Sequence, residues 1–169
     1  MNIMITGASG LLGRACTKAF ADQQPITCAW SRAEKKDLRL DLTDAEAVRA
    51  AIKEHMPDLI IHTAAERKPD ICENQQDLTQ ALNVDATRTL AEAAVDTGAK
   101  LIYFSTDYVF DGSNPPYAVD DECNPLNFYG QTKRAGEEAV LQASDKHVVL
   151  RVPILYGEVE TLEESPITA

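Results

Sequence analysis

The stretch Gly7-Ala8-Ser9-Gly10-Leu11-Leu12-Gly13 follows a short apolar run at residues 2–6 and precedes a segment whose apolar residues recur with the helical period. Glycines let the backbone turn tightly and approach a phosphate closely, and the first N–H groups of a helix carry a partial positive charge. The order of strand, glycine-rich turn and helix therefore predicts a pyrophosphate-binding turn. Its expected binding residues are Gly7, Ser9, Gly10, Leu11, Leu12 and Gly13.

Short apolar runs and helical patterns alternate along the rest of the chain. We expect strands at residues 2–6, 26–30, 38–42, 59–63, 101–105 and 148–152. We expect helices from residue 10, from a Thr43 cap to Pro57, over 78–96 before Gly98, and over 128–143. This order predicts an α/β fold with a doubly wound parallel sheet covered on both faces, whose ligand lies beyond the carboxyl ends of the strands. Residues 107–127 are expected to form a long loop that is either functional or partly mobile.

Composition limits the class of protein further. The 169 residues are 44% hydrophobic and 25% charged, which fits one globular domain with a sizeable core. The net charge of −11 disfavours binding to nucleic acid. The sequence shows neither an apolar run of membrane-spanning length nor a basic leader, so a cytoplasmic protein without membrane attachment is expected. The four cysteines and three histidines are scattered, which predicts reduced thiols, histidines that pack in the interior or lie at the surface, and no metal site.

The ends of the later strands suggest the remainder of a dinucleotide site. An NAD site carries an acidic residue about 20 residues after the glycine turn, to hold the ribose 2′-hydroxyl. Here Ser31-Arg32 follows the second strand, and an arginine suits a 2′-phosphate, so NADP(H) is favoured over NAD(H). The alternative is that Arg32 is a solvated loop charge. Asp41-Leu42 could flank the adenine, and Ala64-Ala65 is small enough for a cofactor to pass close to the backbone.

Tyr129 and Lys133 are four residues apart in a predicted helix, so their side chains lie on one face. A tyrosine with a pKa of about 10 exchanges protons poorly at neutral pH, and a nearby ammonium group would lower that pKa. The pair is therefore a candidate acid/base unit for carbonyl reduction. Thr106 ends the fifth strand and could donate a hydrogen bond to a substrate oxygen. Each feature alone has an ordinary structural explanation, but the three occur in order along one chain.

Together these residues resemble the extended short-chain dehydrogenase/reductases. The resemblance extends from residue 2 to about residue 165 and is strongest for the dTDP-4-dehydrorhamnose reductases and the regulatory β subunits of methionine adenosyltransferase. The strings that carry it are N-V-D-A-T (83–87), S-T-D-Y-V-F-D-G (105–112) and P-L-N-F-Y-G-Q-T-K (125–133). It implies a Rossmann-like NAD(P)-binding domain over residues 1–165.

The resemblance also implies roles for individual residues. Thr106, Tyr129 and Lys133 match the catalytic Thr-Tyr-Lys positions of the family. In the reaction that it implies, hydride passes from the nicotinamide to a keto carbon of a nucleotide sugar. Tyr129 would then protonate the oxyanion, Lys133 would hold the nicotinamide ribose and Thr106 would bond the carbonyl oxygen. Asp107 and Tyr108 would face the substrate, and Pro153 would line the cofactor site.

Two other strings resemble the regulatory subunits more closely. Residues 64–70 read A-A-E-R-K-P-D, close to A-A-E-R-R-P-D, and residues 151–160 and 162–165 resemble the segment after the sixth strand. Thr106 instead matches the reductases. Three functions therefore remain open: a reductase, a cofactor-bound regulatory subunit that partners a methionine adenosyltransferase, and a fragment that only binds NADP(H). A homo-oligomer is compatible with each of them.

Members of the family continue into a C-terminal substrate-binding region. This chain stops soon after its sixth predicted strand, so we expect residues 166–169 to begin a part that is largely missing. The residues that would choose the sugar are therefore expected mainly beyond residue 169.

Overall fold

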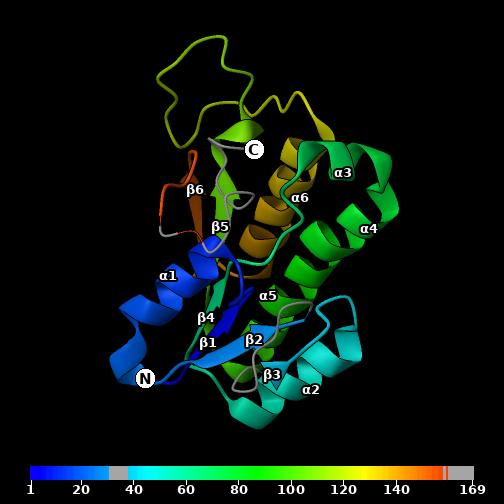
Figure 1. Ribbon diagram of the computed structural model, residues 1–169. Helices are drawn as coiled ribbons and strands as arrows, with labels where there is room; N and C mark the ends of the chain where they lie inside the picture. The colour runs from blue at the N-terminus through cyan, green and yellow to red at the C-terminus, as the bar shows by residue number, and fades with distance from the viewer. Residues whose placement is uncertain (31–37, 158, 160–169) are drawn as a thin grey trace.

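A computed structural model describes residues 1–30, 38–157 and 159 of the chain. Its centre is a six-stranded sheet in which every neighbouring pair is parallel, in the order β3-β2-β1-β4-β5-β6 (Figure 1). The strands are β1 (Ile3–Thr6), β2 (Ile26–Ala29), β3 (Leu38–Arg39), β4 (Leu59–His62), β5 (Lys100–Thr106) and β6 (Val148–Val152). The order reverses between β1 and β4, as it does in doubly wound dinucleotide-binding folds. The expected fold class is therefore confirmed.

The helices cover both faces of this sheet. They are α1 (Leu11–Ala19), α2 (Ala45–His55), α3 (Pro69–Asn74), α4 (Gln76–Gln80), α5 (Ala86–Thr97) and α6 (Phe128–Ala143), with short turns η1 (Ala21–Gln23), η2 (Ala81–Asp85) and η3 (Asp107–Val109). Helices α2, α5 and α6 pack side by side on one face, and α1 lies on the other (Figure 1). Each crossover helix thus brings the chain back to the end of the sheet at which the strands begin, so that the next strand runs parallel to the previous one.

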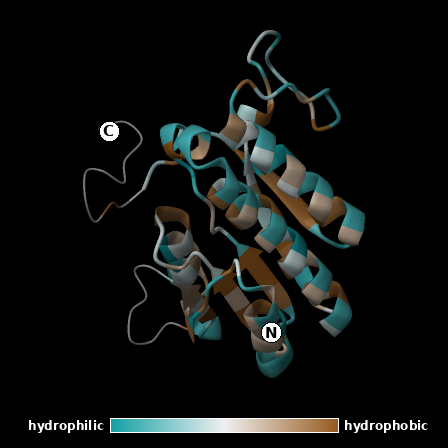
Figure 2. Ribbon diagram, turned by 90° about the vertical axis from the view of Figure 1, so that its right-hand side faces the viewer, coloured by the Kyte–Doolittle hydropathy of each residue, from teal (hydrophilic) through white to brown (hydrophobic). Residues whose placement is uncertain are grey.

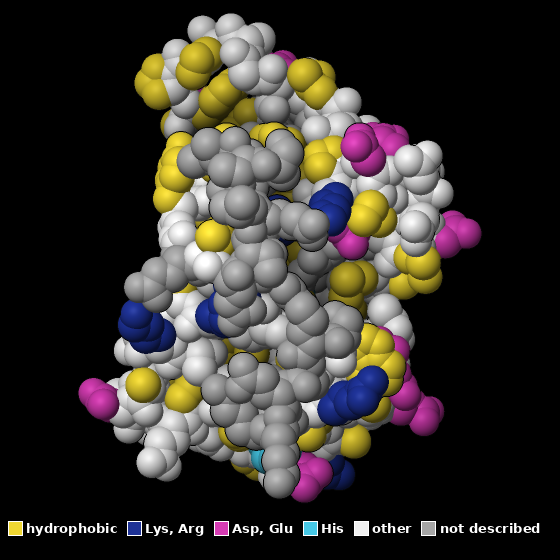
Figure 3. All heavy atoms as spheres, in the orientation of Figure 1, with side chains coloured by type: hydrophobic (Ala, Val, Ile, Leu, Met, Phe, Trp, Pro, Cys, Tyr) yellow, Lys and Arg dark blue, Asp and Glu magenta, His cyan; other side chains and the backbone are white. Residues whose placement is uncertain are grey.

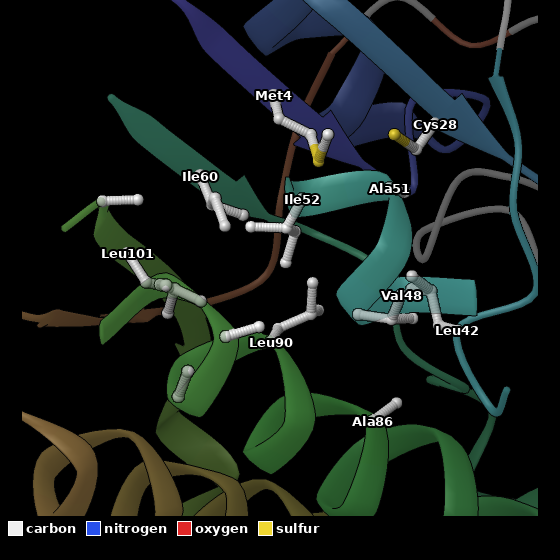
Figure 4. Close-up of a cluster of buried hydrophobic side chains, with 14 of the residues drawn as sticks. Met4, Cys28, Leu42, Val48, Ala51, Ile52, Ile60, Ala86, Leu90 and Leu101 are labelled. Atoms are coloured by element: carbon white, nitrogen blue, oxygen red, sulfur yellow. The ribbon is translucent and has the colours of Figure 1, made fainter. Parts of the chain in front are cut away.

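Alternation along the strands separates the two cores. Met4, Ile60 and Leu101 point toward Ile52 of α2 and Leu90 of α5 and are fully buried (Figure 4). The alternate strand residues, among them the fully buried Ile3 and Ile5 of β1, pack with α1 instead. The hydropathy colouring shows apolar strands between helices whose outer sides are hydrophilic (Figure 2). Burial of both strand faces is the reason that these runs are continuously apolar in sequence.

Several boundaries differ from the sequence-based expectations. The cap of α2 is Asp44, whose carboxylate accepts a hydrogen bond from the Ala47 N–H at 3.0 Å, and the expectation that Thr43 caps this helix is wrong. The Thr43 hydroxyl instead donates to Asp41 Oδ1 at 2.7 Å, because the turn before the helix brings these two side chains together. The expected third strand is shorter, ending at Arg39.

The long helix expected over residues 78–96 is a composite. It starts earlier, as α4, passes through the single π-type turn η2 and continues as α5 until Gly98, which has the positive φ of +77° of a helix terminator. The apolar periodicity continues through both parts, so sequence alone does not mark a one-residue bulge. Within residues 1–30, 38–157 and 159, every helix is too short or too polar to serve as a membrane span.

Candidate functional site

A cleft of about 1100 Å³ opens at the carboxyl ends of the strands. It is lined by the glycine turn, by the segments that follow β2, β3, β4 and β5, by the first turns of α6 and by residues after β6. Every predicted site residue that the structure describes lines this one cleft: Gly7, Ser9, Gly10, Leu11, Leu12, Gly13, Asp41, Leu42, Ala64, Ala65, Thr106, Asp107, Tyr108, Tyr129, Lys133 and Pro153. Ser31 and Arg32 lie outside the described residues.

The glycine turn is tightly packed against the loop after β4. Gly7 has a φ of +73°, and a Cβ atom there would lie 2.6 Å from the Ala64 nitrogen. A Cβ on Gly13 would lie 2.1 Å from the Gly7 carbonyl oxygen. Helix α1 begins after Gly10 with no side-chain cap and no acidic residue in its first turn. Its first N–H groups, which have no partners within the helix, therefore remain for an anion in the cleft.

The end of the cleft near β2 and β3 carries residues that the sequence analysis did not assign. Trp30, the single tryptophan of the chain, is 51% exposed and lines the cleft. The Arg39 guanidinium lies 5.0 Å from the centre of its ring, a distance that allows a cation–π interaction. An aromatic residue at the end of β2 was visible in the sequence, but only the pairing of β2 with β3 brings Arg39 to it.

The wall after β4 is held by an asparagine from the π-type turn. The buried Asn83 side chain accepts a hydrogen bond from the Glu66 N–H at 2.9 Å and donates to the Glu66 carbonyl oxygen at 3.0 Å. It also donates to Thr132 Oγ1 of α6 at 3.2 Å. Asn83 thus connects the wall that contains Ala64-Ala65 with the helix that carries Tyr129. Its string was recognised in the sequence, but no local pattern indicated this role.

Tyr129 and Lys133 lie at the N-terminal end of α6. Asn127 caps this helix, its carboxamide oxygen accepting a hydrogen bond from the Gly130 N–H at 2.8 Å. The Tyr129 ring meets the Tyr108 ring edge-on, with centroids 5.9 Å apart. Thr106 Oγ1 donates to Asp107 Oδ1 at 3.1 Å and accepts from the Tyr108 N–H at 3.2 Å. The predicted acid/base pair and the predicted substrate-side residues therefore lie in one place.

Lys133 is buried beneath the cleft. Its Nζ donates to the Phe104 carbonyl oxygen at 2.7 Å and lies 4.0 Å from the centre of the Tyr103 ring. Burial lowers the pKa of Lys133 to about 7, although the negative charge of Glu137 acts in the opposite direction. Burial thus makes the charged form of Lys133 less stable, relative to the neutral form, than it would be in water.

The pKa of Tyr129 differs from the sequence-based expectation. Burial raises it to about 12, and a hydrogen bond with Thr106 offsets only part of that rise. The Lys133 Nζ, which was expected to lower this pKa, donates instead to the Phe104 carbonyl oxygen at 2.7 Å. Tyr129 therefore carries its phenolic proton at neutral pH.

A series of buried hydrogen bonds connects β4 with β1 and α5. The His62 ring is bonded to Thr6 of β1 through Nδ1 at 2.7 Å and to Thr87 of α5 through Nε2 at 3.0 Å. The Thr87 hydroxyl donates to the Asn83 carbonyl oxygen at 2.8 Å. Burial and the neighbouring Lys133 lower the pKa of His62 to about 3, so the ring is neutral. The expected packing role of this histidine agrees with these contacts.

Neither a cluster of metal-ligating side chains nor a cysteine pair occurs in the part of the chain that the structure describes. Among residues 1–30, 38–157 and 159, no group of three His, Cys, Asp or Glu side chains could hold an ion. All four cysteines are free thiols. The face seen in Figure 3 carries Lys and Arg side chains interspersed with Asp and Glu rather than one basic patch. The cleft is thus the strongest candidate for function.

A Rossmann-like α/β protein with a ligand cleft at the strand ends is the class that this fold and site define. Residues 1–163 match the family model described as "RmlD substrate binding domain", and the chain belongs to that family. It is 51% identical over 168 residues to "Methionine adenosyltransferase 2 subunit beta" of Bos taurus, covering 98% of this chain and 50% of the relative. It is 41% identical over 156 residues to "dTDP-4-dehydrorhamnose reductase" of Streptomyces griseus, covering 91% of this chain and 50% of the relative.

Solved structures agree with the sequence relatives. The crystal structure of dTDP-4-dehydrorhamnose reductase from Bacillus anthracis in complex with NADP matches with a TM-score of 0.84 and 34% identity, over 95% of this chain and 57% of that chain. The expected family resemblance is therefore confirmed. The chain spans about half the length of the curated relatives it matches.

Proposed function

We propose that the chain forms the cofactor-binding part of an NADP(H)-dependent reductase that acts on a nucleotide-linked keto sugar of the dTDP-4-dehydrorhamnose type. The observation that carries this proposal is that Thr106, Tyr129 and Lys133 line the same cleft as the glycine turn. A similar structure holds NADP, and a relative is named for this reduction. The roles of the individual residues are part of the proposal.

The residues present fit a dinucleotide. The uncapped N-terminus of α1 offers N–H groups to a pyrophosphate, and Gly7 and Gly13 allow the close backbone packing that forms the turn. Trp30 offers an aromatic face to an adenine, with the Arg39 cation beside it. We assign a 2′-phosphate to Arg39 at this end of the cleft and therefore favour NADP(H) over NAD(H). Arg32, for which the sequence predicts the same role, lies outside the described residues. When bound, the nicotinamide supplies the hydride.

Side chains of this protein then donate the proton and stabilise the oxyanion. Tyr129, protonated at neutral pH, donates its phenolic proton to the sugar oxygen as negative charge develops there. The Thr106 hydroxyl turns from Asp107 to donate to the same oxygen. Lys133 holds the nicotinamide ribose through Nζ and gains a partner that favours its charged form. Asp107 and Tyr108 face the sugar.

Two variants of the full-length protein that carries this chain test the reductase. Oxidation of NADPH is measured with dTDP-4-dehydrorhamnose as substrate. Tyr129→Phe is expected to remove most turnover, by about 100-fold or more, while NADPH still binds. Tyr156→Phe, at an exposed residue that does not line the cleft, is the matched control and retains turnover. Unchanged turnover in Tyr129→Phe would contradict the assigned proton donor.

A second function is favoured by the identity of 51% to a methionine adenosyltransferase subunit, which exceeds the identity of 41% to the reductase. In this function the protein binds NADP(H) without turnover and modulates a methionine adenosyltransferase. Size-exclusion chromatography of the full-length protein with the methionine adenosyltransferase of the same organism separates the two. Co-elution with changed enzyme kinetics and no NADPH oxidation supports the regulatory function. Separate elution with NADPH oxidation supports the reductase.

A further inference from the structure

A buried carboxylate on α6, the helix that carries Tyr129 and Lys133, forms an ion pair with the edge strand β6. Glu137 follows Lys133 by one helical turn on α6, and its side chain is 0% exposed. Arg151 of β6 donates hydrogen bonds to both of its carboxylate oxygens, from Nε to Oε1 at 2.9 Å and from Nη2 to Oε2 at 2.8 Å. Arg134 adds a third contact at 3.0 Å. This two-pronged geometry is the strongest form of an arginine–carboxylate pair, and here it joins the catalytic helix to the edge strand.

The remaining donors of Arg151 reach the long loop at residues 110–127. Nη1 donates to the Val119 carbonyl oxygen at 3.1 Å, and Nη2 lies 3.3 Å from the Cys123 sulfur. The guanidinium plane also lies 5.0 Å from the centre of the Phe110 ring. Arg151 therefore contacts the loop at its start, its middle and its second half. A single buried carboxylate holds the arginine that makes these contacts.

The loop has a second anchor of its own. Asp111 accepts hydrogen bonds from the Ser113 N–H at 2.8 Å, the Tyr117 hydroxyl at 2.7 Å and the Asn124 carboxamide at 2.9 Å. These donors hold the pKa of Asp111 well below its usual range. The Asp111 contacts are internal to the loop and shape it. The Arg151 contacts described above tie the loop's middle to β6.

Both ends of the loop are parts of the candidate site. The loop leaves η3, which carries Asp107 and Tyr108, and enters α6 at the Asn127 cap, two residues before Tyr129. The Tyr108 carbonyl lies so close to Gly130 that a Cβ atom there would be 2.3 Å from its oxygen. A displacement of the loop therefore changes the edge-on contact of Tyr108 with Tyr129.

We propose that Arg151 is a positioning residue, anchored by Glu137, that holds residues 110–127 and thereby positions Tyr108 and Tyr129, the cleft residues that flank this loop, for the substrate. The geometry requires both partners: Glu137 orients the guanidinium fork, and the fork's outer N–H groups hold the loop. The link from this positioning to the substrate rests on the proposed function. The mechanical coupling of the loop to the catalytic helix does not.

Hydrogen exchange of the full chain, followed by mass spectrometry of peptides, tests the coupling. Arg151→Lys keeps a cation opposite Glu137 but loses the fork that reaches the loop. It is expected to accelerate amide exchange in residues 110–127 about tenfold, with exchange in β1 and α5 unchanged. Glu137→Gln is expected to accelerate exchange in the same loop. Arg49→Lys, in an exposed ion pair with Glu92 at 2.6 Å, is the matched control and leaves the loop unchanged.

Kinetics of the full-length protein add a readout that mere destabilisation would not give. Arg151→Lys should raise KM for the sugar substrate about tenfold and leave KM for NADPH within about twofold, because the glycine turn is untouched. Loop exchange equal to wild type in Arg151→Lys, or equal acceleration in every element, would overturn the proposal. Absence of NADPH oxidation in the wild type would remove the reductase but leave the exchange result, so the two failures are distinguishable.

Discussion

Burial changes the chemistry of two residues whose identity the sequence already supplied. Lys133 and His62 both lie against the Tyr103 ring, in the layer between β5 and the helices. Burial lowers the pKa of Lys133 to about 7 and that of His62 to about 3. Sequence spacing predicts that Tyr129 and Lys133 share a helical face, but it carries no information on how far each is removed from water. The protonation states therefore come only from the structure.

Replacing Lys133 by methionine is expected to stabilise the cofactor-free protein at low pH while weakening NADPH binding. Because the folded pKa of about 7 lies below the ordinary lysine value of 10.5, the unfolded chain binds more protons between these pH values. Stability of the wild type therefore rises with pH across that window, by up to about 1.4 kcal/mol per pH unit from this group. Urea unfolding at pH 6, 7, 8 and 9 should show that Lys133→Met loses this slope. An identical slope in both proteins would contradict the assignment.

The loss of folding stability at acid pH should depend on His62. Its folded pKa of about 3 lies below the ordinary value of 6.5, so the neutral ring contributes stability that is complete above pH 6.5 and is lost as pH falls toward 3. His62→Gln, which can keep bonds to Thr6 and Thr87, is expected to flatten this part of the stability curve. Thermal unfolding between pH 7 and pH 4 measures it, with His55→Gln at the end of α2 as the control. Equal acid sensitivity of His62→Gln and wild type would refute this role.

At the scale of elements, the sequence predicts most of the scaffold and misses the irregular parts. The expected helix at 128–143 and strand at 148–152 match α6 and β6, because a strong apolar period, an Asn127 cap and a β-branched run coincide there. The π-type turn η2 and the short α3 escape prediction, since the contacts that produce them come from distant segments. Asn83 shows this directly: its partners are Glu66 and Thr132.

Close packing of α5 and α6 around Tyr103 gives a prediction for an element. A Cβ atom on Gly136 would lie 2.4 Å from the Tyr103 hydroxyl oxygen and 3.0 Å from the Asn83 carbonyl oxygen. Gly136→Ala should therefore destabilise the protein by about 1–3 kcal/mol, although alanine favours a helix by about 1 kcal/mol over glycine. Tyr103→Phe removes the nearest atom and should restore part of this loss. Chemical denaturation of the single and double variants measures both effects, and additive losses would contradict the proposed clash.

At the scale of the whole molecule, the strand order brings residues that are far apart in the sequence together in one cleft. The glycine turn, the ends of β3 to β5 and the start of α6 lie at one edge because every strand is parallel. The sequence therefore sufficed to predict that these described residues lie together in one cleft. Trp30 with Arg39, Asn83 and the Glu137–Arg151 pair required the structure, because each depends on strand pairing or helix packing across long separations.

The two candidate functions share one premise, that the cleft holds NADP(H). Trp30 is the single tryptophan and lines the cleft, so its fluorescence reports on occupancy without a label. A ligand present at about 100 times its Kd should also raise the free energy of unfolding by about 2.7 kcal/mol. Gly13→Ala is the informative variant, because its Cβ would clash with the glycine turn at Gly7.

Titration of the chain with NADPH and with NADH, followed by Trp30 fluorescence, tests the central claim most directly. We predict saturable quenching by NADPH, with a Kd at least about tenfold lower than for NADH because of the additional phosphate. We also predict that Gly13→Ala abolishes quenching while the chain stays folded by circular dichroism. Absence of saturable quenching by either nucleotide at millimolar concentration in the folded wild-type chain would contradict the account.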